Sequence, residues 1–145
     1  MSGQIHVGSR RGWERTDLIA SLLDHGADGS ELAEIFEGGA SFILPPTIGI
    51  DAIRTGPDGW TDLVGEFHAT WELDGDHVHT VSEVGDDNVL VWTTGSVTAR
   101  ATGASLTLDV RTFFEFSGAR ICRTTVYWRD TAAARIALGT WTSWS

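Results

Sequence analysis

The sequence has a single cysteine, Cys122, in its 145 residues, and it has no lysine. One cysteine cannot form a disulfide within the chain, so the expected compartment is a reducing cytoplasm. The basic residues are ten arginines against 20 acidic residues, which gives a net charge of −10. Apart from Arg10-Arg11 the arginines are scattered, whereas phosphate binding needs clustered cations. The composition therefore argues against a nucleic-acid partner.

Long hydrophobic runs are also missing. No stretch approaches the roughly 20 apolar residues of a membrane span, and no apolar run follows a basic segment near the N-terminus. We therefore expect no membrane partner. With 41% hydrophobic residues the chain can bury the core of one globular domain. Seven tryptophans are many for this length. They supply either core and interface area or an aromatic cavity for a hydrophobic ligand.

The first half of the chain has the apolar spacing of helices, with one strand between them. Residues 1–12 have few apolar anchors and are expected to form a mobile lead. The predicted elements are a helix from Trp13 to a break at Gly26, a short helix Glu31–Glu37 capped by Ser30, a strand Ala40–Leu44 and a helix Trp60–Trp71.

The second half is rich in β-branched and aromatic residues, which favour strands. Turn residues separate four predicted strands, and an Ala-rich helix follows, with Asp130 or Thr131 as N-cap and Gly139 as C-cap. The strands are His77–Val84, Val89–Arg100, Thr107–Phe116 and Arg120–Trp128. Helices followed by strands indicate an α+β domain with a curved antiparallel sheet around the helices.

Two stretches, EIFEGGASFILPP and FFEFSGARICRTTVYWRDTAAARIALG, resemble the nuclear transport factor 2-like superfamily. That group includes SnoaL-like polyketide cyclases, ketosteroid isomerases and limonene epoxide hydrolases. The resemblance covers residues 13–139 as one domain and leaves 140–145 as a tail. It implies a cone-shaped α+β fold, in which a strongly curved mixed or antiparallel sheet wraps around three N-terminal helices and a short C-terminal helix follows. It also implies an apolar pocket at the open end of the cone.

The resemblance, combined with the alternation of side chains along strands, implies which residues face the pocket. Gly95 and Ala99 belong to this inward face. The residues expected to bind substrate are Phe42, Leu44, Thr93, Val97, Val110, Thr112, Phe114, Thr124, Val126 and Trp128.

The acid and base positions of the relatives hold residues without a titratable side chain. They fall on Leu44, Ala20 and Thr112 for ketosteroid isomerases, and on Thr93, Gly95 and Val126 for limonene epoxide hydrolases. General acid–base catalysis needs a titratable group within reach of the substrate. The candidate catalytic residues that remain are Thr112, as a hydrogen-bond donor, and His68, near the pocket mouth. Threonine is also a common strand residue, so its role stays open.

Two other features suggest chemistry but have simpler readings. His77, His79 and Glu83 have the spacing of a strand metal site, and the resemblance turns their face away from the pocket. No further histidine follows His79, so a solvated polar face is the better interpretation, and we expect no metal and no cofactor. Cys122 has no evident activating partner and is interpreted as a buried structural cysteine.

The outer face of the sheet is expected to join two copies of the chain. Asp109 and Arg111 share that face, where an ion pair would orient a dimer. Trp92 and Tyr127 have the same outward parity, and exposed aromatic residues on a sheet tend to mark interfaces. The resemblance likewise implies a homodimer.

These observations favour a SnoaL-like cyclase or isomerase of secondary metabolism. Its substrate would be a hydrophobic polyketide- or terpenoid-like intermediate, held in a folded shape by an apolar pocket without the usual acid and base. The alternative is a non-catalytic module of the same fold that binds a hydrophobic ligand, which needs no acid or base. A third possibility is a subunit whose apolar surface binds another chain.

Overall fold

Seven strands of the chain form one mixed sheet in the computed structural model, which describes residues 3–7, 13–45, 48, 50 and 53–139. The strand order is β1-β4-β5-β6-β7-β2, and β3 pairs separately with β5. The outer pairs β1–β4 and β2–β7 are parallel, while the inner pairs are antiparallel. The elements are β1 (Gly3–Val7), α1 (Trp13–His25), α2 (Gly29–Ile35), β2 (Phe36–Ile43), α3 (Pro57–Thr70), β3 (Trp71–Leu73), β4 (His77–Val84), β5 (Asn88–Ala99), β6 (Ser105–Ser117), β7 (Arg120–Trp128) and α4 (Thr131–Leu138).

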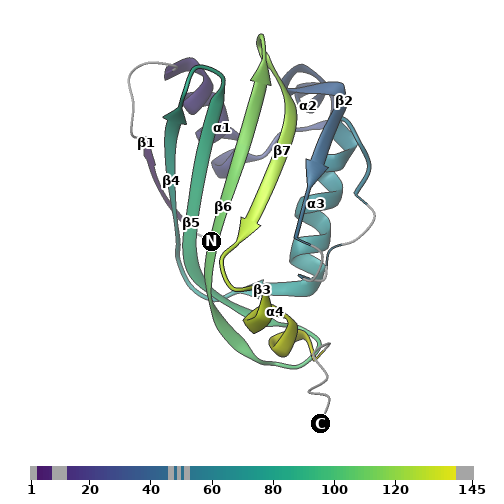
Figure 1. Ribbon diagram of the computed structural model, residues 1–145, viewed down its shortest axis with the longest axis vertical. Helices are drawn as coiled ribbons and strands as arrows, with labels where there is room; N and C mark the ends of the chain where they lie inside the picture. The colour runs from purple at the N-terminus through teal and green to yellow at the C-terminus, as the bar shows by residue number, and fades with distance from the viewer. Residues whose placement is uncertain (1–2, 8–12, 46–47, 49, 51–52, 140–145) are drawn as a thin grey trace.

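The sheet curls strongly, so that it forms half of a barrel around the helices. In Figure 1 helices α1 and α3 lie behind the sheet, and β3 and α4 lie at the lower end, where β5 and β6 bend. Four helices and a curled mixed sheet confirm the predicted α+β cone. Within the described ranges, no helix has both the length and the apolar character needed to cross a membrane.

The closing hairpin and helix form as their turn residues predict. Gly118 has a φ of 67° in the β6–β7 turn, a conformation that side chains with a Cβ disfavour. The Asp130 carboxylate accepts a hydrogen bond from the backbone N–H of Ala133 at 2.9 Å, and Gly139 ends α4 with a φ of 75°. Of the two candidate N-caps, Asp130 is the one that caps α4, and Gly139 is confirmed as the C-cap.

The N-terminal half differs from the prediction in several places. The third helix begins at Pro57 and not at Trp60, and Trp71, expected to end it, is the first residue of strand β3. Gly3–Val7 is a strand inside the segment expected to be a mobile lead, and it pairs in parallel with β4. Helix α2 is capped by Asp28 instead of Ser30, because the Asp28 carboxylate accepts from the N–H of Glu31 while the Glu31 carboxylate accepts from the N–H of Asp28. Strand β2 starts at Phe36, whose ring is completely buried. The predicted tail at 140–145 lies outside the described residues.

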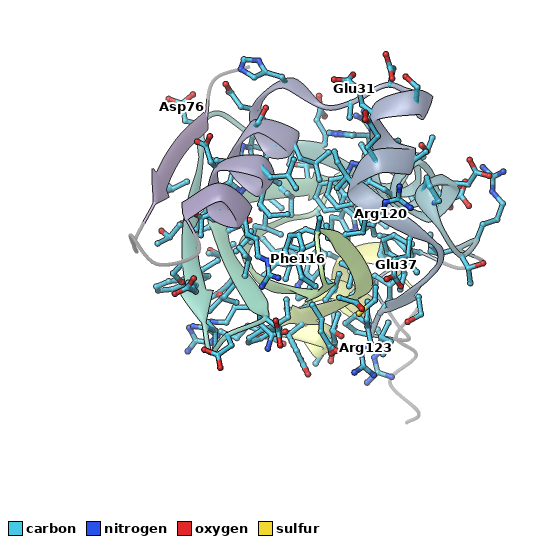
Figure 2. The ribbon with its side chains drawn as sticks, turned by 90° about the horizontal axis from the view of Figure 1, so that it is seen from above. Glu31, Glu37, Asp76, Phe116, Arg120 and Arg123 are labelled. Atoms are coloured by element: carbon cyan, nitrogen blue, oxygen red, sulfur yellow. The ribbon has the colours of Figure 1, made fainter. Side chains whose placement is uncertain are left out.

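Two apolar clusters make up the core. One joins α1 and α2 to the sheet through residues such as Ile19, Phe36 and Phe114. The other joins α4 and β3 to the bent end of the sheet through residues such as Trp71 and Trp128. Figure 2 looks down from above and shows Phe116 inside the ring of ribbons, while Glu31, Asp76 and Arg123 lie at its periphery.

An ion pair fixes the start of α3 to the segment before it. The Asp62 carboxylate accepts hydrogen bonds from the Arg54 side chain at 2.8 and 2.9 Å and from the Arg54 backbone N–H at 3.0 Å. These hydrogen bonds stabilise the ionised carboxylate and lower the pKa of Asp62 to about 2. Asp62 therefore stays ionised well into the acidic range, so this anchor holds α3, which forms one wall of the cavity described below.

Candidate functional site

A cavity of about 590 Å³ lies between the inner face of the sheet and helices α1 and α3. Its volume is in the range of sites for drug-sized ligands. The wall is mainly apolar, and it takes residues from both core clusters, such as Phe114 from the first and Trp128 from the second. Helix α3 contributes Trp60, Leu63 and Phe67. Apolar lining of this extent suits a hydrophobic molecule.

Cross-strand pairing arranges the sheet wall of the cavity in rows. His79 pairs with Thr93, Thr93 with Val110, and Val110 with Trp128, so that one row crosses four strands. Directly paired residues share a face of the sheet, and all four line the cavity. This row is polar at β4 and aromatic at β7. The cavity therefore has a polar side and an apolar side.

The residues expected in the pocket divide into two groups. Four of them do not line the cavity. Val97 and Thr124 are fully buried in the core. Leu44 packs against the second cluster, and the Phe42 ring lies 5.6 Å from that of Phe36. The residues that do line it are Thr93, Val110, Thr112, Phe114, Val126 and Trp128, together with His68.

His77 and His79 line the cavity, contrary to the prediction that their face points away from it. The reason is the register of the β4–β5 hairpin, which places His79 directly opposite Thr93. Since Thr93 faces inward, its partner must do so too. The three-residue turn Gly85-Asp86-Asp87 joins Val84 to its partner Asn88 and sets this register. Glu83, the third residue of the spacing, does not line the cavity.

His79 is held in place by its neighbour across the hairpin. Its Nδ1 lies 2.7 Å from the Thr93 hydroxyl oxygen, a hydrogen-bonding distance. Burial lowers the pKa of His79, and the nearby His77 lowers it further. The imidazole is therefore neutral at physiological pH. The Nδ1 contact leaves Nε2 as the nitrogen available to a molecule in the cavity.

His77 is buried beside it without a hydrogen-bond partner. Its side chain is 2% exposed, and neither ring nitrogen is paired. Gly95 makes room for the ring, because a Cβ there would lie 2.6 Å from Cδ2 of His77. Buried polar groups in native proteins are nearly always paired, so this wall has unused hydrogen-bonding capacity.

Three exposed polar residues of the cavity wall lie where α3 meets β3 and β5, while the exposed wall residues Gly26 and Val64 lie elsewhere. His68, Glu72 and Arg100 line the cavity there and are exposed. The Arg100 Nε–H donates to the carbonyl oxygen of His68 at 2.7 Å, which joins the end of β5 to the end of α3. This polar rim marks the mouth of the cavity.

The candidate metal spacing and the lone cysteine were the other features of the sequence that suggested chemistry. In the part of the chain that the structure describes, no group of three or more His, Cys, Asp or Glu side chains could hold a metal ion. The Cys122 thiol is half-buried and donates to the carbonyl oxygen of Glu115, and burial raises its pKa. A raised pKa disfavours the reactive thiolate, in agreement with a structural cysteine.

The outer face of the sheet carries exposed aromatic rings. Tyr127 is 56% exposed and Trp92 is 40% exposed. The expected ion pair between Asp109 and Arg111 is replaced by another arrangement. Asp109 pairs with Arg129 at 3.2 Å and accepts from the Trp92 indole N–H at 2.9 Å, while Arg111 lies over the Trp92 ring. The hydrogen bond from Trp92 is the main reason that the pKa of Asp109 is lowered.

Solved structures of other proteins share this architecture. A candidate SnoaL-like polyketide cyclase from Jannaschia sp. CCS1 is 15% identical, with a TM-score of 0.64 over 90% of this chain and 96% of its own. A nuclear transport factor 2-like protein from Burkholderia thailandensis E264 is 16% identical, with a TM-score of 0.64 over 88% and 98%. TerC, co-crystallised with polyporic acid, is 18% identical, with a TM-score of 0.59 over 87% and 97%.

No protein-family model and no curated protein matches the sequence. The likeness to the solved structures nevertheless spans nearly the whole of both chains in each comparison. It agrees with the curled sheet, the helices inside it and the closing hairpin and helix described above. The chain therefore has the fold of the nuclear transport factor 2-like superfamily.

Proposed function

We propose that this chain is a cyclase or isomerase that acts on a hydrophobic small molecule of polyketide or terpenoid type. The observation that carries the proposal is the cavity of about 590 Å³, with its aromatic side at Trp128 and its polar side at His79 and Thr93. Such a wall can hold a flexible chain in a folded shape, and proximity alone lowers a reaction barrier by several kcal/mol. Structural neighbours that include a candidate polyketide cyclase support this class of reaction.

The test is turnover of substrates with the proposed chemistry. Short poly-β-keto thioesters and acyclic terpenoid aldehydes are incubated with the protein, and products are followed by liquid chromatography and mass spectrometry. We expect cyclic or rearranged products from the natural chain. Val110→Phe fills the cavity from β6 and should abolish them, whereas Thr107→Phe, at an exposed position of the same strand, should not. Equal activity of both variants would show that the chemistry does not take place in the cavity.

The second candidate function is binding of a hydrophobic ligand without turnover. It is favoured by Leu44, Ala20 and Thr112 at positions where ketosteroid isomerases have catalytic groups. TerC, a neighbour of the same fold, was co-crystallised with a small molecule. If the chain only binds, the thioesters and aldehydes of the turnover test should quench its tryptophan fluorescence without forming product. Val110→Phe should abolish this quenching.

We also propose that two copies of the chain pair through the outer face of the sheet. The exposed rings of Trp92 and Tyr127 and the mixed charges of Asp109, Arg111 and Arg129 support a self-complementary surface. Light scattering should give a mass of about twice 15.7 kDa for the natural chain and 15.7 kDa for Tyr127→Arg. Ile136→Arg, at a 62% exposed position of α4, is the control and should remain dimeric. A natural chain of 15.7 kDa would contradict the pairing.

A further inference from the structure

The polar side of the cavity has hydrogen-bonding capacity that the described protein does not use. His79 offers Nε2, because its Nδ1 is already bonded to the Thr93 hydroxyl. His77 lies two residues away on the same face of β4, and both of its ring nitrogens lack a partner. The rest of the row across the sheet is apolar from Val110 to Trp128. A ligand that fills the cavity therefore meets a polar group at its β4 end.

The charge of that group decides which ligand it suits. Burial and the neighbouring His77 lower the pKa of His79, so its imidazole is neutral. The arginine of the cavity wall is Arg100, which lies at the mouth of the cavity and not at the β4 end. A carboxylate or phosphate placed at His79 would be buried without a compensating charge, which is unfavourable. A neutral hydroxyl can donate to or accept from an imidazole nitrogen.

We propose that His79, positioned by Thr93, binds a hydroxyl group on an otherwise apolar ring system, with the rings extending toward Trp128. The inference rests on the proposed function of the cavity and names the substrate class: a hydroxylated aromatic or enolic molecule. It also gives His79 a chemical role. When Nδ1–H donates to Thr93, Nε2 takes the hydroxyl proton; the O–H bond breaks, an N–H bond forms and the electron pair stays on oxygen, so an imidazolium and an oxyanion form side by side and each charge compensates the other. The resulting enolate has a nucleophilic ring carbon, which a cyclisation requires.

Three probes of similar shape test the recognition by equilibrium dialysis: 2-naphthol, 2-methylnaphthalene and 2-naphthoate. The natural chain should bind 2-naphthol about five- to tenfold more tightly than 2-methylnaphthalene, as expected for one net hydrogen bond, although the methyl compound is the more hydrophobic. It should bind 2-naphthoate most weakly. His79→Phe should reverse the order of naphthol and methylnaphthalene, whereas His25→Gln, at an exposed position of α1, should leave it unchanged.

Thr93 is a positioning residue in this proposal, and its test separates orientation from shape. Thr93→Val keeps the size of the side chain but removes the hydroxyl that holds Nδ1, so the preference for 2-naphthol should fall several-fold; Thr93→Ser should restore it. If 2-methylnaphthalene binds at least as well as 2-naphthol to the natural chain, or if His79→Phe keeps the naphthol preference, the inference is overturned while a hydrophobic cavity stands. If no probe binds and Val110→Phe changes nothing, the proposed function fails with it.

Discussion

Replacing Trp71 with alanine is expected to lower the free energy of unfolding by about 3–5 kcal/mol, the range for removing a large aromatic ring from a core. The Trp71 side chain is completely buried, and its ring centroid lies 5.2 Å from that of Trp128. Its indole N–H donates to the carbonyl oxygen of Ile48 at 3.1 Å. Alanine removes the ring and leaves that buried carbonyl without its partner, so the loss of packing and the loss of the hydrogen bond add.

Trp71→Phe separates these two contributions. Phenylalanine retains most of the ring contact with Trp128 but cannot donate to Ile48, so we expect a loss of about 1–3 kcal/mol from the unpaired carbonyl and the smaller ring. Urea denaturation followed by circular dichroism measures both variants at the same pH. An Ala variant within about 1 kcal/mol of the natural chain would contradict the packing of β3 described here.

The same experiment reports on the cavity. Trp128 lines the cavity and is supported from behind by Trp71, which does not line it. A folded Trp71→Ala protein should therefore bind hydrophobic probes more weakly, because Trp128 loses the ring that fixes its position. The second core cluster thus links stability to the shape of the site.

The parts of the fold that were predictable from the sequence depend on local chemistry. The β6–β7 turn needs a positive φ at Gly118, and α4 needs an acceptor at Asp130 and a left-handed residue at Gly139. Each of these residues acts within a few positions along the chain, so a local sequence pattern can reveal it. Strand β1 was missed because its pairing partner, β4, lies some 70 residues away in the sequence, and no local pattern marks a parallel partner.

In the candidate site too, features set by local sequence were predictable and features set by long-range packing were not. Val110, Thr112 and Phe114 line the cavity as expected, because the resemblance gave the inner face of their strand and alternation along one strand is a local property. Thr124 has the correct parity, but it is covered by the core and does not reach the cavity, which alternation cannot reveal. His79 was misplaced because its face was assigned by resemblance and not by pairing it with Thr93 through the hairpin. The register of the short β4–β5 hairpin predicts the face of His79 more reliably than the resemblance does.

Gly59→Ala in α3 is expected to lower the free energy of unfolding by about 3 kcal/mol, at the upper end of the range for overpacking. A Cβ at this position would overlap the Phe42 ring and the backbone carbonyl oxygen of Arg54. The ring can rotate away, but the carbonyl belongs to the segment that Asp62 holds in place through Arg54. Relief therefore requires α3 to move, and α3 forms one wall of the cavity.

Gly65→Ala in the same helix is the matched control. Nothing lies within 4 Å of a Cβ at Gly65, so alanine there should raise the free energy of unfolding by about 0.5–1 kcal/mol through its higher helix propensity. The same chemical change is thus expected to have opposite signs six residues apart. Thermal and urea denaturation of the two variants measure this difference. If Gly59→Ala is also stabilising, α3 does not pack against Phe42 and the segment at Arg54 as closely as described, and the cavity wall is looser.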